Sequence, residues 1–395
     1  MYLTKEEERM LNGEYGPAVE KSMRLLVTLG DIYGAERMVE ISSAQIAGIS
    51  YKNIGDPGLE FLEGFLEEGA KVRVPAFMNP AGMDLEAWSE LGIPEEFAEK
   101  QMRIVNALKK MGVYAAATCT PYLAGLLPRY REHIAWSESS AVIFANSVIG
   151  ARTNREGGPS ALAAAITGRT PMYGFHLDEN RIPEVTIVVE PEVKTSFDFG
   201  ILAHAICKKF KKGVPYITGI NPTHANVDRL KLFGATLAAY GAFSLFHMEN
   251  ITPENVEVPK ERIHIEASDL NESKEEMGEK LDSVDLIVIG CPHASVDGIK
   301  RILKVLNGRR MKVPMLVFTS RSVRAIAKRT NLISELEKLN VKVIADTCPV
   351  VMPLEHLKVK RVATNSGKAV YYLPNTNKVE VLFDSLERLV ERFGE

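Results

Sequence analysis

The sequence has few cysteines and lacks the short motifs that mark several common enzyme classes. Its 395 residues include four cysteines and eight histidines, and no histidine pair has the H-x-x-x-H or H-E-x-x-H spacing of a zinc hydrolase. No G-x-G-x-x-G opens a helix after a strand and no G-K-[ST] is present, so a nucleotide site is not indicated. Four cysteines are too few for a disulfide scaffold, which favours a reduced, cytoplasmic protein.

An excess of one charge and a long apolar run are also missing. The chain has 48 Lys and Arg against 51 Asp and Glu, a formal net charge of −3, whereas a general nucleic-acid binder usually carries a basic face or tail. No stretch approaches the ~18 apolar residues of a membrane helix. The N-terminal "MYLTKEEERML" lacks the apolar core of a signal peptide. We therefore expect a partner that is neither nucleic acid nor membrane.

The C-terminal part of the chain alternates between two kinds of hydrophobic pattern. "VDLIVIG", "VPMLVFTS" and "VKVIADTCP" are predicted strands, separated by the predicted helices "SVDGIKRILKVLNG" and "RSVRAIAKRTNLISELEKLN". Strands that alternate with helices of this length indicate a parallel sheet and an α/β fold. "YAAATCTPY" and "KAVYYLP" are predicted as further strands, and "NKVEVLFDSLERLVERFG" as a closing helix. A Lys- and Glu-rich stretch over residues 257–283 is the best candidate for a domain boundary. We therefore expect a division into residues 1–200, 201–280 and 281–395.

Three of the four cysteines lie where a proline follows within two positions at the end of a predicted strand: Cys119, Cys291 and Cys348. Proline stops a strand, and ligands of parallel sheets gather beyond the carboxyl ends of the strands. Three thiols without a fourth favour an iron–sulfur cluster with one iron left open, although each thiol could instead be a separate buried residue before a turn. Cys207, in the helical "ILAHAICKKFKKG", is expected to be a core residue.

Several loops are rich in glycine and in polar or basic groups. They are "AGISYKNIGDPG", "FMNPAG", "WSESSAVIFANSVIGARTNREGGPSA" and "TNSGKAVYY". Glycine permits close approach of the backbone, and Lys or Arg supplies a countercharge for a carboxylate or phosphate. Solvated turns with ordinary surface charges remain an alternative for each loop. Arg152 and Arg155 are secondary candidates, since they could equally brace the "TNREGG" turn.

With "GCPHAS" and "DTCPV", these stretches resemble the aconitase X family over the whole chain. The resemblance implies an aconitase-like fold, in which parallel sheets flanked by helices form two or three subdomains around a central cleft. It also implies a [4Fe-4S] cluster, with one open iron, held by Cys119, Cys291 and Cys348. The substrate pocket that it implies is formed by Gly48, Ile49, Ser50, Asn79, Pro80, Glu138, Ser139 and Lys368.

The resemblance also carries an expectation about activity. Aconitase proper takes two cluster ligands from a C-x-x-C pair, which this chain lacks, and no swivelling domain precedes Glu395. The two-subunit type is therefore implied, with a small swivelling-domain subunit that supplies the base. Its reaction is dehydration of a phosphorylated hydroxy acid, (R)-5-phosphomevalonate, to trans-anhydromevalonate 5-phosphate in a modified mevalonate pathway. The alternatives are dehydration of cis-3-hydroxy-L-proline, or a non-catalytic iron–sulfur scaffold that uses Cys207.

Overall fold

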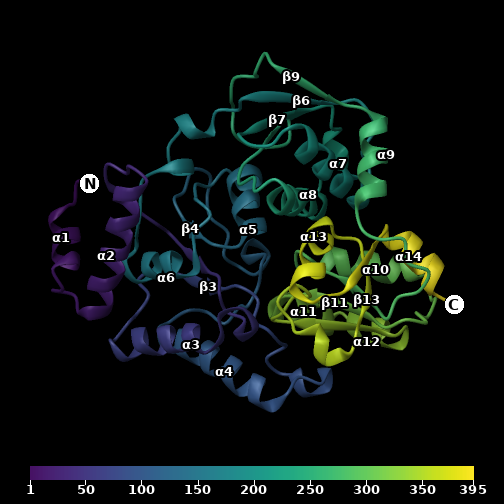
Figure 1. Cartoon of the computed structure of the whole chain (residues 1–395), viewed down its shortest axis with the longest axis horizontal. Helices are drawn as coiled ribbons and strands as arrows, with labels where there is room; N and C mark the ends of the chain where they lie inside the picture. The colour runs from purple at the N-terminus through teal and green to yellow at the C-terminus, as the bar shows by residue number, and fades with distance from the viewer.

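The computed structural model describes residues 1–395, and three parallel sheets form the centres of three lobes (Figure 1). The first lobe, purple to blue, lies on the left of the view. The second, teal to green, lies at the top, and the third, green to yellow, at the lower right. No helix combines the length and the apolar character needed to cross a membrane.

The first lobe contains a three-stranded parallel sheet in the order β3-β2-β4 and a small antiparallel pair, β1 with β5. A capping box begins α1, since the Thr4 hydroxyl accepts from the backbone of Glu7 and the Glu7 carboxylate accepts from the backbone of Thr4. The elements are α1 (Lys5–Leu11), α2 (Pro17–Ile32), β1 (Met38–Glu40), β2 (Ala44–Ile46), α3 (Tyr51–Glu67), β3 (Ala76–Met78), α4 (Glu95–Lys110), β4 (Ala135–Trp136), α5 (Ser139–Phe144), α6 (Gly158–Thr167) and β5 (Arg169–Pro171).

The second lobe is built on a four-stranded parallel sheet in the order β8-β7-β6-β9. Helices α7 and α8 pack against each other beneath it, and both bury apolar side chains in the core of this lobe (Figure 1). Its elements are β6 (Val185–Val189), α7 (Ser196–Lys209), β7 (Pro215–Thr218), α8 (Val227–Tyr240), β8 (His247–Met248), β9 (Arg262–Ile265) and α9 (Ala267–Glu276).

The third lobe contains the predicted parallel sheet, with five strands in the order β12-β11-β10-β13-β14. The chain order reverses between β10 and β13, so the carboxyl ends of these two strands flank a topological switch point, where α/β proteins bind ligands. Its elements are β10 (Leu286–Ile289), α10 (Val296–Leu306), β11 (Met315–Thr319), α11 (Arg321–Arg329), α12 (Leu332–Lys338), β12 (Val341–Ala345), β13 (Arg361–Thr364), α13 (Gly367–Thr376), β14 (Glu380–Phe383) and α14 (Leu386–Phe393).

Four expectations about secondary structure are wrong. The first part of "NKVEVLFDSLERLVERFG" forms strand β14, and only its second part forms helix α14. "KAVYYLP" lies in helix α13, because the Ser366 hydroxyl caps its first turn by accepting from the backbone of Ala369 at 3.1 Å. The segment before Cys119 forms only one bridge to β3, since a φ of 25° at Ala117 turns the chain out of the extended conformation. The predicted helix over residues 321–340 is two helices, divided at Asn331, which has a φ of 62°.

An ion-pair network joins the first and third lobes. The Arg321 guanidinium donates to Asp84 Oδ1 at 2.7 Å and also pairs with Asp346, and both carboxylates are almost fully buried. Asp84 Oδ2 accepts from the backbone of Ala345 at 2.9 Å, and the backbone of Ala81 donates to the Asp346 carbonyl at 2.8 Å. These bonds hold the end of β12 against the loop that follows β3.

Candidate active site

A cavity of about 250 Å³ lies where the loops of the first lobe meet the third lobe. Loops that follow β2, β3 and β4 supply most of its wall, because parallel strands place their carboxyl ends at one edge of the sheet. The first turn of α13, after β13, supplies the facing side. All eight predicted substrate residues line this cavity: Gly48, Ile49, Ser50, Asn79, Pro80, Glu138, Ser139 and Lys368.

A buried ion pair spans the cavity from one lobe to the other. Lys368 Nζ pairs with Glu138 Oε1 and approaches Ser139 Oγ at 3.3 Å. Burial by itself would raise the pKa of the Glu138 carboxyl, but the charge and hydrogen bond of Lys368 hold that pKa at about 2. Glu138 in turn keeps the pKa of Lys368 above its usual value, although burial opposes this. Both side chains are therefore charged at neutral pH, and they largely neutralise each other.

Two polar side chains in the wall, Asn79 and Ser50, have oxygen atoms that can still accept a hydrogen bond from a ligand. Asn79 Nδ2 donates to Glu138 Oε2 at 2.9 Å, while Asn79 Oδ1 is buried without any hydrogen-bond partner. An unpaired buried acceptor costs free energy unless a ligand or water satisfies it, so this oxygen is a ready acceptor for a substrate hydroxyl. Ser50 Oγ donates to the Val351 carbonyl at 3.0 Å, which ties the loop after β2 to the chain that follows Cys348.

The three predicted cluster cysteines are buried next to this cavity. Cys119, Cys291 and Cys348 expose 5%, 4% and 8% of their surface, and burial raises the pKa of each thiol to about 12. The ionisation of each one also perturbs the pKa of another of the three, so the three sulfurs share one electrostatic environment. The charge of Lys368 lowers the pKa of all three and therefore favours their thiolate forms.

The remaining cysteine lies elsewhere. Cys207 is in α7, among the apolar side chains of the second-lobe core, and its thiol is 3.9 Å from the Leu237 carbonyl. Burial raises the pKa of the Cys207 thiol to about 12. No charged group of the cavity contributes to that shift, so the structure places this thiol outside the cysteine group.

The two secondary arginines have different surroundings. Arg152 is 4% exposed, pairs with Asp178 and Glu254, and donates to the His176 carbonyl at 3.3 Å, so it braces the fold. Arg155 is exposed, lines the cavity and makes no ion pair or hydrogen bond. The motifs could not separate the two, because their difference depends on which way each side chain leaves the turn.

Comparison with known proteins assigns the chain to a family. The model of the first domain of aconitase X matches residues 1–179, that of the second domain residues 183–275, and that of the third domain residues 284–395. Together these matches span almost the whole chain. The chain belongs to the aconitase X family. Its three matched segments correspond to the three lobes, and membership of this family points to an iron–sulfur cofactor.

Individual aconitase X proteins are similar over their full length. The large subunit of phosphomevalonate dehydratase from Methanocaldococcus jannaschii is 50% identical, over 99% of this chain and all of the relative. The cis-3-hydroxy-L-proline dehydratase of Pseudomonas aeruginosa is 32% identical, and the match covers 98% of this chain but 68% of that protein. The crystal structure of Thermococcus kodakaraensis aconitase X in its holo-form superposes with a TM-score of 0.92 at 46% identity, over all of both chains. The aconitase-like fold is thereby confirmed.

The donor type of the cysteine group suits an iron–sulfur cofactor, whose usual ligands are thiolates. No three His, Cys, Asp or Glu side chains converge on one metal-ion position. The hydroxyls of Tyr122 and Thr347 are buried without partners beside Cys119 and Cys348, as expected around a group that could accept their hydrogen bonds.

Proposed function

We propose that this chain is the large subunit of a phosphomevalonate dehydratase, which removes water from (R)-5-phosphomevalonate to give trans-anhydromevalonate 5-phosphate. The observation that carries the proposal is the single cavity in which all eight candidate substrate residues meet beside three buried thiols. Relatives named as large subunits of that enzyme support the choice of substrate, since the match covers nearly all of both chains. The hydroxyproline dehydratases are less similar, at 32% and 30% identity.

We assign Cys119, Cys291 and Cys348 as the ligands of a [4Fe-4S] cluster. When bound, such a cluster with one iron free of protein ligands supplies a Lewis acid for the departing hydroxyl. The thiols must lose their protons to bind it, and thiols with pKa values of about 12 do so only when a cation is present. Cluster uptake is therefore expected to release protons.

The chain's own residues bind and orient the substrate. Asn79 Oδ1 accepts a hydrogen bond from the substrate hydroxyl, and Lys368 Nζ, which Glu138 and Ser139 orient, donates its remaining N–H to the substrate carboxylate. Ser50 donates its hydroxyl proton to the Val351 carbonyl, so its oxygen can still accept a hydrogen bond from a substrate hydroxyl. These contacts hold the bond between C3 and its hydroxyl in one orientation. They raise the rate of dehydration mainly by lowering the entropic cost of reaching the reactive geometry.

Arg155 is the candidate partner of the phosphate. Lys368 is neutralised by Glu138, which leaves Arg155 as the unpaired positive charge in the cavity wall. Arginine presents a planar fork that suits phosphate oxygens, and its position at the exposed edge suits the end of an extended substrate. Hydroxyproline has no phosphate and would not need this group.

A small swivelling-domain subunit is the proposed source of the base that removes the C2 proton while the C3 hydroxyl leaves, so that one molecule of water is lost overall. The test is anaerobic reconstitution with iron and sulfide, addition of the small subunit, and product analysis by mass spectrometry. Phosphomevalonate and cis-3-hydroxy-L-proline are offered separately at equal concentration. Dehydration of phosphomevalonate alone supports the proposal, and preferential turnover of hydroxyproline refutes it. A stable cluster with turnover of neither compound would favour the scaffold.

A further inference from the structure

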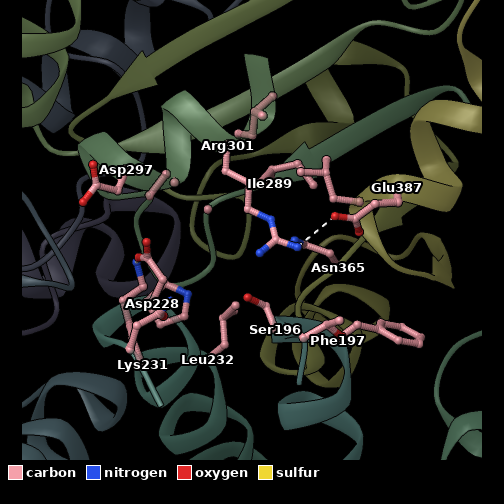
Figure 2. Close-up of a pocket in the computed structure, with 18 residues that line it drawn as sticks. Ser196, Phe197, Asp228, Lys231, Leu232, Ile289, Asp297, Arg301, Asn365 and Glu387 are labelled. Atoms are coloured by element: carbon pink, nitrogen blue, oxygen red, sulfur yellow. Dashed lines mark hydrogen bonds and ion pairs between the residues drawn. The ribbon is translucent and has the colours of Figure 1, made fainter. Parts of the chain in front are cut away.

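The loop that carries Cys291 also borders a second cavity, of about 290 Å³, between the second and third lobes (Figure 2). Pro292 and Ala294 line this cavity from the loop, and Asp228 and Lys231 line it from α8. In Figure 2 Asp228 and Lys231 lie together, away from the Arg301–Glu387 pair. His293 lies between Pro292 and Ala294, but it has no exposed surface and does not line the cavity.

His293 lies on the Cys291 loop and makes hydrogen bonds to the other two cysteine loops. Its ring Nε2 is 2.8 Å from the carbonyl of Thr347, which precedes Cys348, and its ring Nδ1 is 2.9 Å from the hydroxyl of Thr118, which precedes Cys119. Its backbone N–H donates to Cys119 Sγ at 3.2 Å. His293 itself follows Cys291 by two residues, so one side chain and its backbone connect the segments of all three thiols.

The partners define the direction of each bond. A carbonyl oxygen only accepts, so Nε2 carries the proton and donates to Thr347. Nδ1 of the neutral ring then accepts from the Thr118 hydroxyl, whose oxygen still accepts from the backbone N–H of Thr120 at 3.1 Å. Every donor and acceptor of the ring is satisfied in one tautomer, which fixes the orientation of the ring.

The backbone of His293 is held from the other side by α8. Lys231 Nζ donates to the His293 carbonyl at 2.7 Å and to Asp228 Oδ1 at 2.7 Å. Ser295 Oγ, the N-cap of α10, donates to Asp228 Oδ2 at 2.6 Å. The second lobe therefore anchors the residue that connects the cysteine loops.

We propose that His293 is a positioning residue that holds the three cysteine loops at the separation that the iron–sulfur cluster requires. This inference rests on the proposed cofactor. It does not make His293 a ligand, because both ring nitrogens are already used by protein groups. Groups that orient metal ligands typically change metal retention by about 10- to 100-fold when removed.

The test compares three variants of the reconstituted chain under anaerobic conditions. His293→Phe keeps an aromatic ring but removes both ring bonds, and Thr118→Val removes only the bond to Nδ1. His247→Phe is the matched control, since His247 is equally buried and its Nε2 bonds to a backbone carbonyl, that of Arg181, at 2.8 Å. The readouts are the rate of iron loss to a chelator, the electron paramagnetic resonance spectrum of the oxidised cluster, and the thermal midpoint of the cluster-free chain.

His293→Phe is expected to lose iron about 10- to 100-fold faster than the wild type and to show an altered spectrum. Thr118→Val is expected to change both in the same direction by less, which tests the idea even if His293→Phe does not fold. His247→Phe should retain iron like the wild type, whatever its thermal midpoint. Wild-type iron retention in both His293→Phe and Thr118→Val, or equal loss in the control, would overturn the inference. A wild type that takes up no cluster would refute the cofactor assignment as well, before any variant is compared.

Discussion

Replacing Lys368 by Met removes one charge from the buried pair and leaves the other without a partner. The two side chains have comparable length, so the main change is electrostatic. Lys368 is 7% exposed, and the Glu138 side chain that it neutralises, between the lobes, is 15% exposed. Breaking a buried pair from one side typically costs about 3–5 kcal/mol, since the remaining charge is uncompensated. We expect a loss of this size in the free energy of unfolding of the cluster-free chain near pH 7.

The same loss should depend on pH in a defined direction. In the wild type the folded pKa of Glu138, about 2, lies below its usual value of 4.5, so the stability from the pair is present above the usual value and lost as the pH falls toward the folded one. In Lys368→Met, burial without the countercharge raises the pKa of Glu138. The folded variant then takes up a proton at a higher pH than the unfolded chain does, so its deficit relative to the wild type should shrink as the pH falls toward the usual value of 4.5.

Urea unfolding followed by tryptophan fluorescence measures this effect, because Trp136 is fully buried two residues before Glu138. The double variant Glu138→Gln/Lys368→Met has no buried charge at this position and should recover most of the loss. Wild-type stability of Lys368→Met at neutral pH would refute the reasoning. A double variant no more stable than Lys368→Met would refute it too, since the unpaired carboxylate could not then be the cause.

Three further results are expected. Arg155→Ala should raise KM for phosphomevalonate about 10- to 100-fold by removing charged hydrogen bonds to the phosphate, whereas inhibition by the unphosphorylated acid should not change; equal effects on both would contradict the assignment. Arg321→Met should destabilise the chain by about 3 kcal/mol or more, because Asp84 and Asp346 stay buried, while exposed Arg329→Met should be nearly neutral; equal stabilities would argue against the network. Replacing Cys119, Cys291 or Cys348 singly by Ser should abolish the iron–sulfur absorbance. Cys207→Ser should leave this absorbance unchanged.

The sequence was most informative where one local pattern repeats. Between β10 and β12 the apolar strands and capped helices alternate regularly, and the parallel sheet follows from that alternation. The run after Ser366 is predicted as a strand because "AVYYL" is apolar, whereas in the structure the Ser366 hydroxyl caps the first turn of a helix. Helix and strand are hard to distinguish in short apolar runs of this kind.

The candidate site was predictable in its residue types but not in its connections. Prolines at strand ends indicated which thiols leave the sheet, and the structure buries those three in a common electrostatic environment. The role of His293 could not be read from "GCPHAS", since its partners, Thr118 and Thr347, lie far away in the sequence. The division at residues 200 and 280 stays a prediction.

The most direct test of the account is the rate of phosphomevalonate dehydration by the reconstituted chain as small subunit is added anaerobically. The account predicts negligible turnover by the chain alone, because a positioned general base typically contributes about 10²–10⁴-fold and is proposed to lie on the partner. The rate should rise with added small subunit and then saturate. Full dehydration by the 395-residue chain without the partner would contradict the account and place the base among its own residues.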